Sequence, residues 1–101
     1  MVHFKAKISY ERENILKFLS HLDMVRTFYR VIRRTDLPLI YTQGYSPRPY
    51  ISFSPATRVG ILPADEFIII RLTKKLSEDY ILKCMEEKLP PLIKIKEVNY
   101  L

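Results

Sequence analysis

Polar and apolar residues alternate over the first segment of the chain. From His3 to Tyr10, apolar side chains occupy every second position, with lysines and a serine between them. A period of two is typical of a strand with one buried face, because successive side chains of a strand point to opposite faces. The pattern therefore predicts a half-buried strand over residues 3–10, followed by a polar turn at 11–14.

A helical pattern follows from Ser20. Ser20 is typical of a helix N-cap, and Asp23 stands three residues later, where an acidic side chain favours the positive end of a helix. The helix is expected to run to about Asp36 and to end before Pro38. At about 100° per residue, one arc is apolar and predicted to face the core: Leu22, Val25, Phe28, Tyr29 and Ile32. A second arc, centred about 130° away, contains Arg26, Arg30, Arg33 and Arg34.

The middle of the chain predicts two more strands. An extended piece at 39–41 precedes a strand over residues 50–54, and an irregular stretch at 55–65 leads to a strand over 66–73. This last strand has three consecutive isoleucines and so no polar face, which indicates a central position in the sheet.

The C-terminal part predicts a helix and a strand. The helix, over residues 78–89, follows the typical N-cap residue Ser77 and is ended by two prolines. Its apolar side contains Ile81, Leu82, Met85 and Leu89. Alternation over 92–100 predicts a strand with Ile93, Ile95 and Glu97 on one face, and Lys94, Lys96 and Val98 on the other.

The resulting order, β-α-β-β-α-β, predicts an α+β domain of the ferredoxin-like type, with two helices on one face of a four-stranded antiparallel sheet. A length of 101 residues with 48% hydrophobic content is enough for one core, so we expect a single domain over 1–101. The longest apolar run is too short to span a membrane, and the first residues do not resemble a signal peptide. We therefore expect a cytoplasmic protein without a membrane partner.

The distribution of charge points to an anionic partner. The formal net charge is +6, and the excess lies in the first 60 residues. Between residues 20 and 60, the basic side chains are all arginines: Arg26, Arg30, Arg33, Arg34, Arg48 and Arg58. Arginine binds phosphate through paired N–H donors and stacks on bases. The exclusive use of arginine in this segment therefore favours a polyanionic partner. The alternative is a solvated face of an ordinary surface helix.

The loop at 42–49 combines amide, aromatic and guanidinium groups with a glycine and two prolines. Gly44 permits positive φ, and the prolines stiffen the exit from the loop. Such a mixture can stack a base and fork a phosphate, which makes four residues candidates for contact with single-stranded RNA: Gln43, Tyr45, Arg48 and Tyr50. The loop can equally be a rigid structural turn.

A possible proton-transfer site stands at the start of the first helix. Its candidates are Ser20, His21, Asp23 and Tyr41. Histidine is a common general base in proton transfer near neutral pH, and His21 stands at the start of the helix. The alternative is that His21 packs against the sheet.

Most catalytic and metal-binding motifs are absent from the sequence. It has no phosphate-binding glycine motif, nucleophile elbow, zinc-ligand spacing or carboxylate cluster. The single cysteine, Cys84, can form no internal disulfide and stands among apolar residues, so we expect a small buried hydrophobe. We therefore assign no catalytic residue, metal site or cofactor, and an autonomous enzyme is not favoured.

Two blocks of sequence resemble the radical-SAM-linked domain family. The first runs from Phe18 to Asp23 with Arg26, Arg33, Arg34, Leu37 and Pro38, and the second from Gln43 to Pro49 with Tyr41 and the segment 51–53. Members of that family, which is uncharacterised, stand alone or are fused to the C-terminal side of B12-binding radical SAM proteins. The resemblance implies a radical SAM partner and a chain that is the first half of a longer protein. The three-cysteine motif of the radical SAM enzymes themselves is missing.

Three functions remain open at this stage. The first is a non-catalytic module for RNA binding or RNA modification. The second is a protein-interaction domain that docks on a radical SAM enzyme. The third is a metal-independent endoribonuclease that uses His21.

Overall fold

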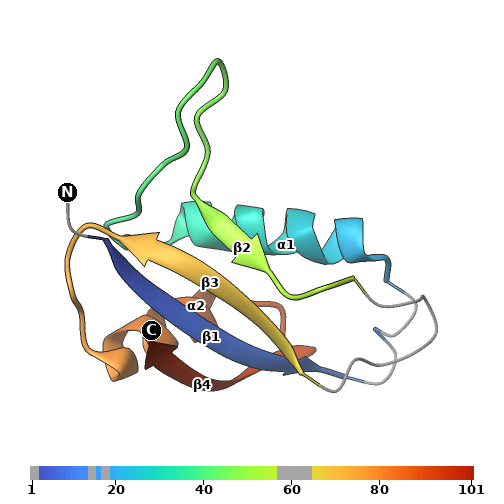
Figure 1. The fold of residues 1–101 in the computed structure, drawn as a ribbon. Coiled ribbons are helices and arrows are strands. Elements are labelled where there is room, and N and C mark those ends of the chain that lie inside the picture. Colours follow the sequence, from blue (N-terminus) through green and yellow to red (C-terminus); the bar gives the residue numbers. More distant parts are fainter. Residues whose placement is uncertain (1–2, 14–15, 17–18, 57–64) are drawn as a thin grey trace.

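The computed structural model describes residues 3–13, 16, 19–56 and 65–101. Six elements follow one another in this part of the chain: β1 (Phe4–Arg12), α1 (His21–Arg34), β2 (Ile51–Phe53), β3 (Glu66–Leu72), α2 (Glu78–Lys88) and β4 (Ile93–Tyr100). The strands form one antiparallel sheet in the order β2-β3-β1-β4, and both helices lie behind it in Figure 1. The predicted ferredoxin-like α+β fold is confirmed, as is the central position of β3.

The core lies between the sheet and the two helices. Ala6 and Ile8 of β1 and Ile68 and Ile70 of β3 are fully buried on the helix-facing side. The helices contribute Phe28, Ile32, Ile81 and Met85, which are also fully buried. Each such aliphatic or aromatic side chain contributes about 1.5–3 kcal/mol to folding when it leaves water. The alternation in β1 therefore fixes which face of the sheet carries the helices.

The buried side of α1 differs from the predicted one. Its buried residues are Met24, Phe28, Val31 and Ile32, whereas Leu22 is 54% exposed. By helical spacing, the observed buried arc is rotated by about 75° from the predicted arc. The prediction that Leu22 faces the core is therefore wrong. The rotation places the arginine arc almost directly opposite the core.

Strand β4 contains an irregularity that the sequence pattern did not predict. Ser9 of β1 pairs with Glu97, but the next residue, Tyr10, pairs with Ile95, so Lys96 is an extra residue in β4. A β-bulge of this kind shifts the alternation by one position. Val98 therefore lies in the core with Ile93, and its assignment to the opposite face was wrong.

The element ends differ by a few residues from those predicted. Helix α1 ends at Arg34, because Thr35 adopts an extended conformation and donates from its backbone N–H and its hydroxyl to the carbonyl oxygen of Ile32. Ser77 caps α2 as predicted, by accepting a hydrogen bond from the backbone N–H of Tyr80. Cys84 is partly buried against the core. Most of the irregular stretch expected at 55–65 lies outside the described residues.

A narrow projection, the finger (residues 41–49), rises from the sheet between α1 and β2 (Figure 1). Tyr41 pairs with Pro49 at its base, and the backbone N–H of Thr42 donates to the carbonyl oxygen of Arg48. Below the finger, Ile40 hydrogen-bonds both Arg71 of β3 and Tyr50. The expected extended piece at 39–41 is thus present as single bridges that anchor the finger to the sheet.

Candidate nucleic-acid interface

The structure gathers five arginines around one groove between α1 and the finger. This arginine groove has a volume of about 490 Å³ and is lined by Arg26, Tyr29, Arg30, Arg33, Arg34 and Arg48. Four of the arginines come from the predicted arc of α1. The fifth, Arg48, comes from the predicted loop, so folding joins two separate candidate regions into one site.

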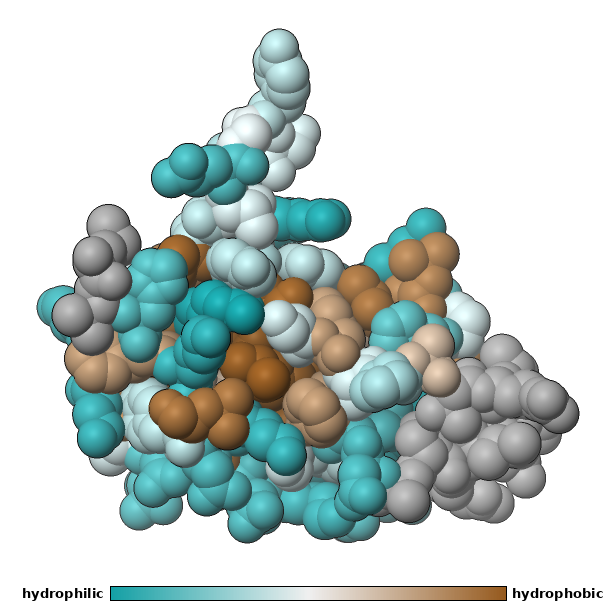
Figure 2. Space-filling view, in the orientation of Figure 1, coloured by the Kyte–Doolittle hydropathy of each residue, from teal (hydrophilic) through white to brown (hydrophobic). Residues whose placement is uncertain are grey.

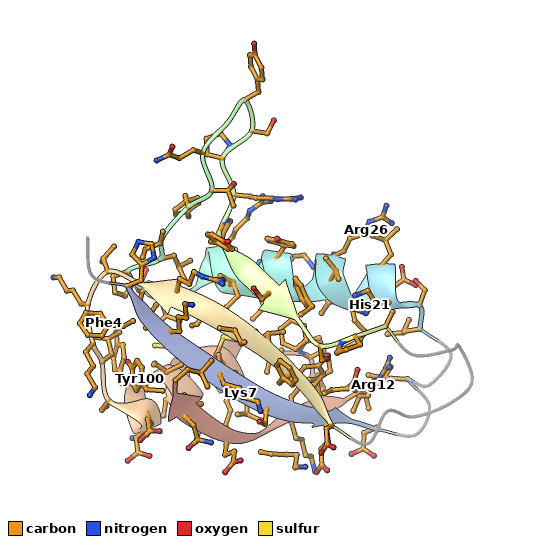
Figure 3. All side chains as sticks on the ribbon, in the orientation of Figure 1. Phe4, Lys7, Arg12, His21, Arg26 and Tyr100 are labelled. Atoms are coloured by element: carbon orange, nitrogen blue, oxygen red, sulfur yellow. The ribbon has the colours of Figure 1, made fainter. Side chains whose placement is uncertain are left out.

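The rotation of α1 explains why its arginines are free to form a site. All four are exposed, and Figure 3 shows Arg26 pointing away from the strands. Like charges four residues apart, as in Arg26 and Arg30 or Arg30 and Arg34, destabilise a helix by a few tenths of a kcal/mol each. The packing of α1 does not require arginines at these positions, because the helix contacts the core through its opposite side.

Tyr29 forms the floor of the arginine groove. The guanidinium carbon of Arg48 lies 5.5 Å from the centre of its ring, and that of Arg33 lies 6.0 Å away. The ring is partly buried and packs against Phe53 of β2, with 5.8 Å between ring centres. Cation–π attraction therefore holds guanidinium groups from α1 and the finger on the same ring.

The groove arginines have no acidic partners within the part of the chain that the structure describes. The ion pairs there join Arg12 to Glu66 and Lys94 to Glu13, at 3.0 and 3.9 Å. Guanidinium groups bind phosphate and carboxylate through paired N–H donors. The arginine groove therefore presents five guanidinium groups that an anionic ligand can bind without displacing a carboxylate. Arg58 lies outside the described residues.

The finger adds a second groove that is continuous with the first through Arg33 and Arg48. Its volume is about 580 Å³, and it is lined by Arg33 and by residues 42–48. Gln43 and Tyr45 therefore line the same groove as Arg33 and Arg48. Tyr45 is fully exposed, and the neighbouring Gly44 has φ of 136°, a conformation that L side chains rarely adopt.

Tyr50 does not belong to either groove. It lies on the side of the sheet away from the helices, with the Arg71 guanidinium carbon 3.8 Å from the centre of its ring. The predicted nucleic-acid residues are thus divided between two surfaces of the domain. Arg71 was missed because it stands inside a strand of isoleucines, although its alternation with Ile70 and Leu72 was a visible signal.

The structure does not bring all four candidate proton-transfer residues together. Ser20 and Asp23 hydrogen-bond each other in a capping box: the Asp23 backbone N–H donates to the Ser20 hydroxyl at 3.1 Å, and the Asp23 carboxylate accepts from Ser20. His21 points towards the strands (Figure 3), where its ring lies nearly perpendicular to that of Phe53, with 6.2 Å between the ring centres.

Tyr41 lies in a different region from His21. It pairs with Pro49 at the base of the finger, whereas Phe53, the neighbour of His21, is four residues further along the extended chain. Four extended residues span about 13 Å. The structure therefore gives His21 a packing position and does not place Tyr41 beside it as a second proton carrier.

Within the described ranges, no group of three histidine, cysteine or acidic side chains could hold a metal ion. The helices found there are also too short or too polar to cross a membrane.

The fold and the arginine groove define a ferredoxin-like α+β domain with a cationic candidate interface. Residues 5–101 match a family described as an uncharacterised protein conserved in bacteria (DUF2344), and the chain belongs to this family. No curated protein and no solved structure matches the chain.

Proposed function

We propose that this protein is an RNA-binding module that holds RNA phosphates in the arginine groove. The observation that carries the proposal is the convergence of five arginines, from a helix and a separate loop, on one groove without an acidic partner among the described residues. Guanidinium forks match phosphate geometry, and the amide and aromatic groups of the finger match exposed bases. The domain supplies binding and orientation, and no residue is assigned a chemical step.

We further propose that the bound RNA is presented to a radical SAM enzyme. Support comes from the resemblance of the two sequence blocks to radical-SAM-linked domains. One of those blocks contains three arginines of the groove, and the other contains the finger. The segments that carry the resemblance therefore overlap the segments that form the candidate interface.

Removal of two central arginines tests RNA binding. We expect Arg30→Ala/Arg34→Ala to weaken binding of a fluorescent RNA hairpin and to reduce the salt dependence of the binding constant. The slope of log K against the logarithm of the salt concentration is negative, and each lost phosphate contact should reduce its magnitude by about 1. Both positions are exposed, so the variant should fold. Fluorescence anisotropy over a salt series measures both quantities.

A matched control removes the same charge elsewhere. Lys83→Ala/Lys88→Ala changes two exposed cations on α2, none of whose residues lines the groove. If both double variants bind alike, only net charge matters and the groove is not the site. The proposed function fails if the wild-type protein does not bind the hairpin at low salt.

The second candidate function is docking on a radical SAM enzyme without RNA. The exposed finger favours it, because Tyr45 projects a ring into solvent at the end of a stiffened loop. Under this alternative, the enzyme co-purifies with the protein after nuclease treatment, and Tyr45→Ala releases it. Loss of the enzyme on nuclease treatment would instead favour contact through RNA.

A further inference from the structure

The outer face of the sheet, on the side away from the helices, carries apolar and aromatic side chains that no described element covers. Figure 2 shows this face with a hydrophobic area over the strands, bordered by hydrophilic residues. By strand alternation, Phe67 and Ile69 of β3 point to this face, since Ile68 and Ile70 point to the core. Tyr50, which directly follows the finger in sequence, lies on the same face and is 43% exposed.

Cations accompany the two aromatic rings. The Arg71 guanidinium lies over Tyr50 and donates a hydrogen bond of 3.1 Å to the hydroxyl of Ser52. The Lys7 ammonium nitrogen lies 4.5 Å from the ring centre of Phe67. Each ring is therefore paired with a positive group that is held beside it.

The register concentrates positive charge at one end of this face. Lys5 pairs with Arg71, and Lys7 with Ile69, whereas the acidic side chains of Asp65 and Glu97 share a groove with Phe67 towards the other end of β3. None of these three cations forms an ion pair within the described residues. A partner that complements these rings and cations combines flat apolar groups with negative charges. Single-stranded nucleic acid does so, because its bases stack on aromatic rings while its phosphates bind cations.

The face is also continuous with the proposed RNA site. Tyr50 directly follows the finger, and its backbone N–H donates to Ile40 at the finger's base. Arg48, two residues earlier, lies over Tyr29 in the arginine groove. An extended RNA strand can therefore pass from the arginine groove, around the edge of the sheet at β2, to the outer face.

We propose that the outer face binds single-stranded RNA, with bases stacked on Tyr50 and Phe67 and phosphates held by Lys5, Lys7 and Arg71. This inference rests on the proposed function and adds the class of RNA to it. The arginine groove alone holds phosphates of either a duplex or a single strand. The outer face favours unpaired bases, because only these expose their flat surfaces.

The test compares a short single-stranded oligouridine with an RNA duplex of the same length. We expect Tyr50→Ala to weaken oligouridine binding about tenfold through loss of one stacked base, and to leave duplex binding unchanged. Phe67→Ala should act in the same way. Tyr80→Ala is the matched control, since Tyr80 is 47% exposed on α2 and does not contribute to the sheet face.

Lys7→Gln provides a variant that leaves both rings in place. It should also weaken oligouridine binding more than duplex binding, because it removes a phosphate contact on the outer face alone. Circular dichroism confirms that each variant is folded.

Other outcomes would overturn the inference and remain distinct from failure of the proposed function. If the outer-face variants bind both RNAs normally while Arg30→Ala/Arg34→Ala loses both, the groove stands and the outer face does not bind RNA. If the wild-type protein binds neither RNA, the proposed function itself fails.

Two further occupants of the face are tested with the same variants. A wild-type dimer in sedimentation that becomes a monomer on Tyr50→Ala would assign the face to a second copy of the chain. A lysate protein that the wild type retains after nuclease treatment, and that Tyr50→Ala loses, would assign it to a protein partner. Either result contradicts the RNA proposal.

Discussion

Glu66 links the central strands through two side chains of β1. Its carboxylate accepts hydrogen bonds from the Arg12 guanidinium at 3.0 Å and from the Tyr10 hydroxyl at 3.2 Å. Arg12 also donates to the carbonyl oxygen of Leu16 and so ties this residue to the sheet. The ionic side chains are only 6% and 9% exposed, so this pair is a buried one. Loss of one partner from such a pair costs about 3–5 kcal/mol, because it leaves the other charge buried.

The Tyr10 hydroxyl should make the folded state less stable at alkaline pH. Burial, and secondly the charge of Glu66, raise the pKa of Tyr10 well above its ordinary value. The native state therefore keeps a proton that the unfolded state loses above about pH 10, so the free energy of unfolding should fall as the pH rises beyond that value.

Tyr10→Phe should remove this dependence. We expect the variant to be about 1 kcal/mol less stable than the wild type at neutral pH, because it lacks the hydrogen bond to Glu66. Between about pH 8 and about pH 11, its free energy of unfolding should fall less than that of the wild type. Urea unfolding at both pH values measures the difference. Equal losses in the two proteins would show that Tyr10 is not the group responsible.

At the scale of elements, the sequence predicts the order of strands and helices because each has a clear period. Alternation at Ala6, Ile8 and Tyr10 identifies the buried side of β1, and Ser20 and Ser77 identify both helix starts. These signals are local and depend on neighbouring residues only.

The orientation of α1 and the path of β4 are not determined by local signals. Apolar residues occupy so much of the circumference of α1 that two buried arcs, one including Leu22 and one including Met24, fit the pattern. Contact with the sheet selects the second arc. In β4, the extra residue Lys96 is recognisable only from its pairing with β1.

The candidate site was predicted in parts. The arginine arc of α1 and Arg48 were identified separately, and their meeting over Tyr29 depends on how the finger returns to the sheet. The helical period predicts a core position for Tyr29, whereas its ring both packs against the core and lines the arginine groove. Tyr50 was grouped with the finger because it follows it in sequence, but alternation along the chain turns it to the outer face.

The finger provides a test of its own backbone conformation. Gly44 has φ of 136°, and an added Cβ would meet no heavy atom within 4 Å, so the cost of Gly44→Ala is one of backbone strain alone. We expect the free energy of unfolding to fall by about 1–3 kcal/mol. Gln43→Ala, in the same loop, should change it by less than about 0.5 kcal/mol. An unaltered free energy for Gly44→Ala would indicate a different conformation of the loop.

At the scale of the whole molecule, the net charge of +6 is unevenly placed. Five arginines converge on one groove, and their mutual repulsion lowers the stability of the folded state. A multivalent anion that binds the folded groove should therefore stabilise the protein by mass action.

We expect inorganic phosphate to raise the thermal midpoint more than chloride at equal ionic strength. A domain of this size gains roughly 4–8 °C for each kcal/mol of added stability. Thermal unfolding followed by circular dichroism measures the shift. Arg30→Ala/Arg34→Ala should lose most of the difference between the two salts, whereas Lys83→Ala/Lys88→Ala should retain it. An equal response of both variants would mean that phosphate acts on overall charge or through its general exclusion from protein surfaces, and not in the groove.

The bulge at Lys96 also bears on the solubility of the protein. β4 is an edge strand of the sheet. A flat edge strand has unpaired backbone N–H and C=O groups to which a strand of another copy can add. Here the extra residue interrupts that regular edge, and exposed charges at Lys94, Lys96 and Glu97 surround the interruption. The feature that directs Val98 into the core therefore also protects the domain against edge-to-edge aggregation.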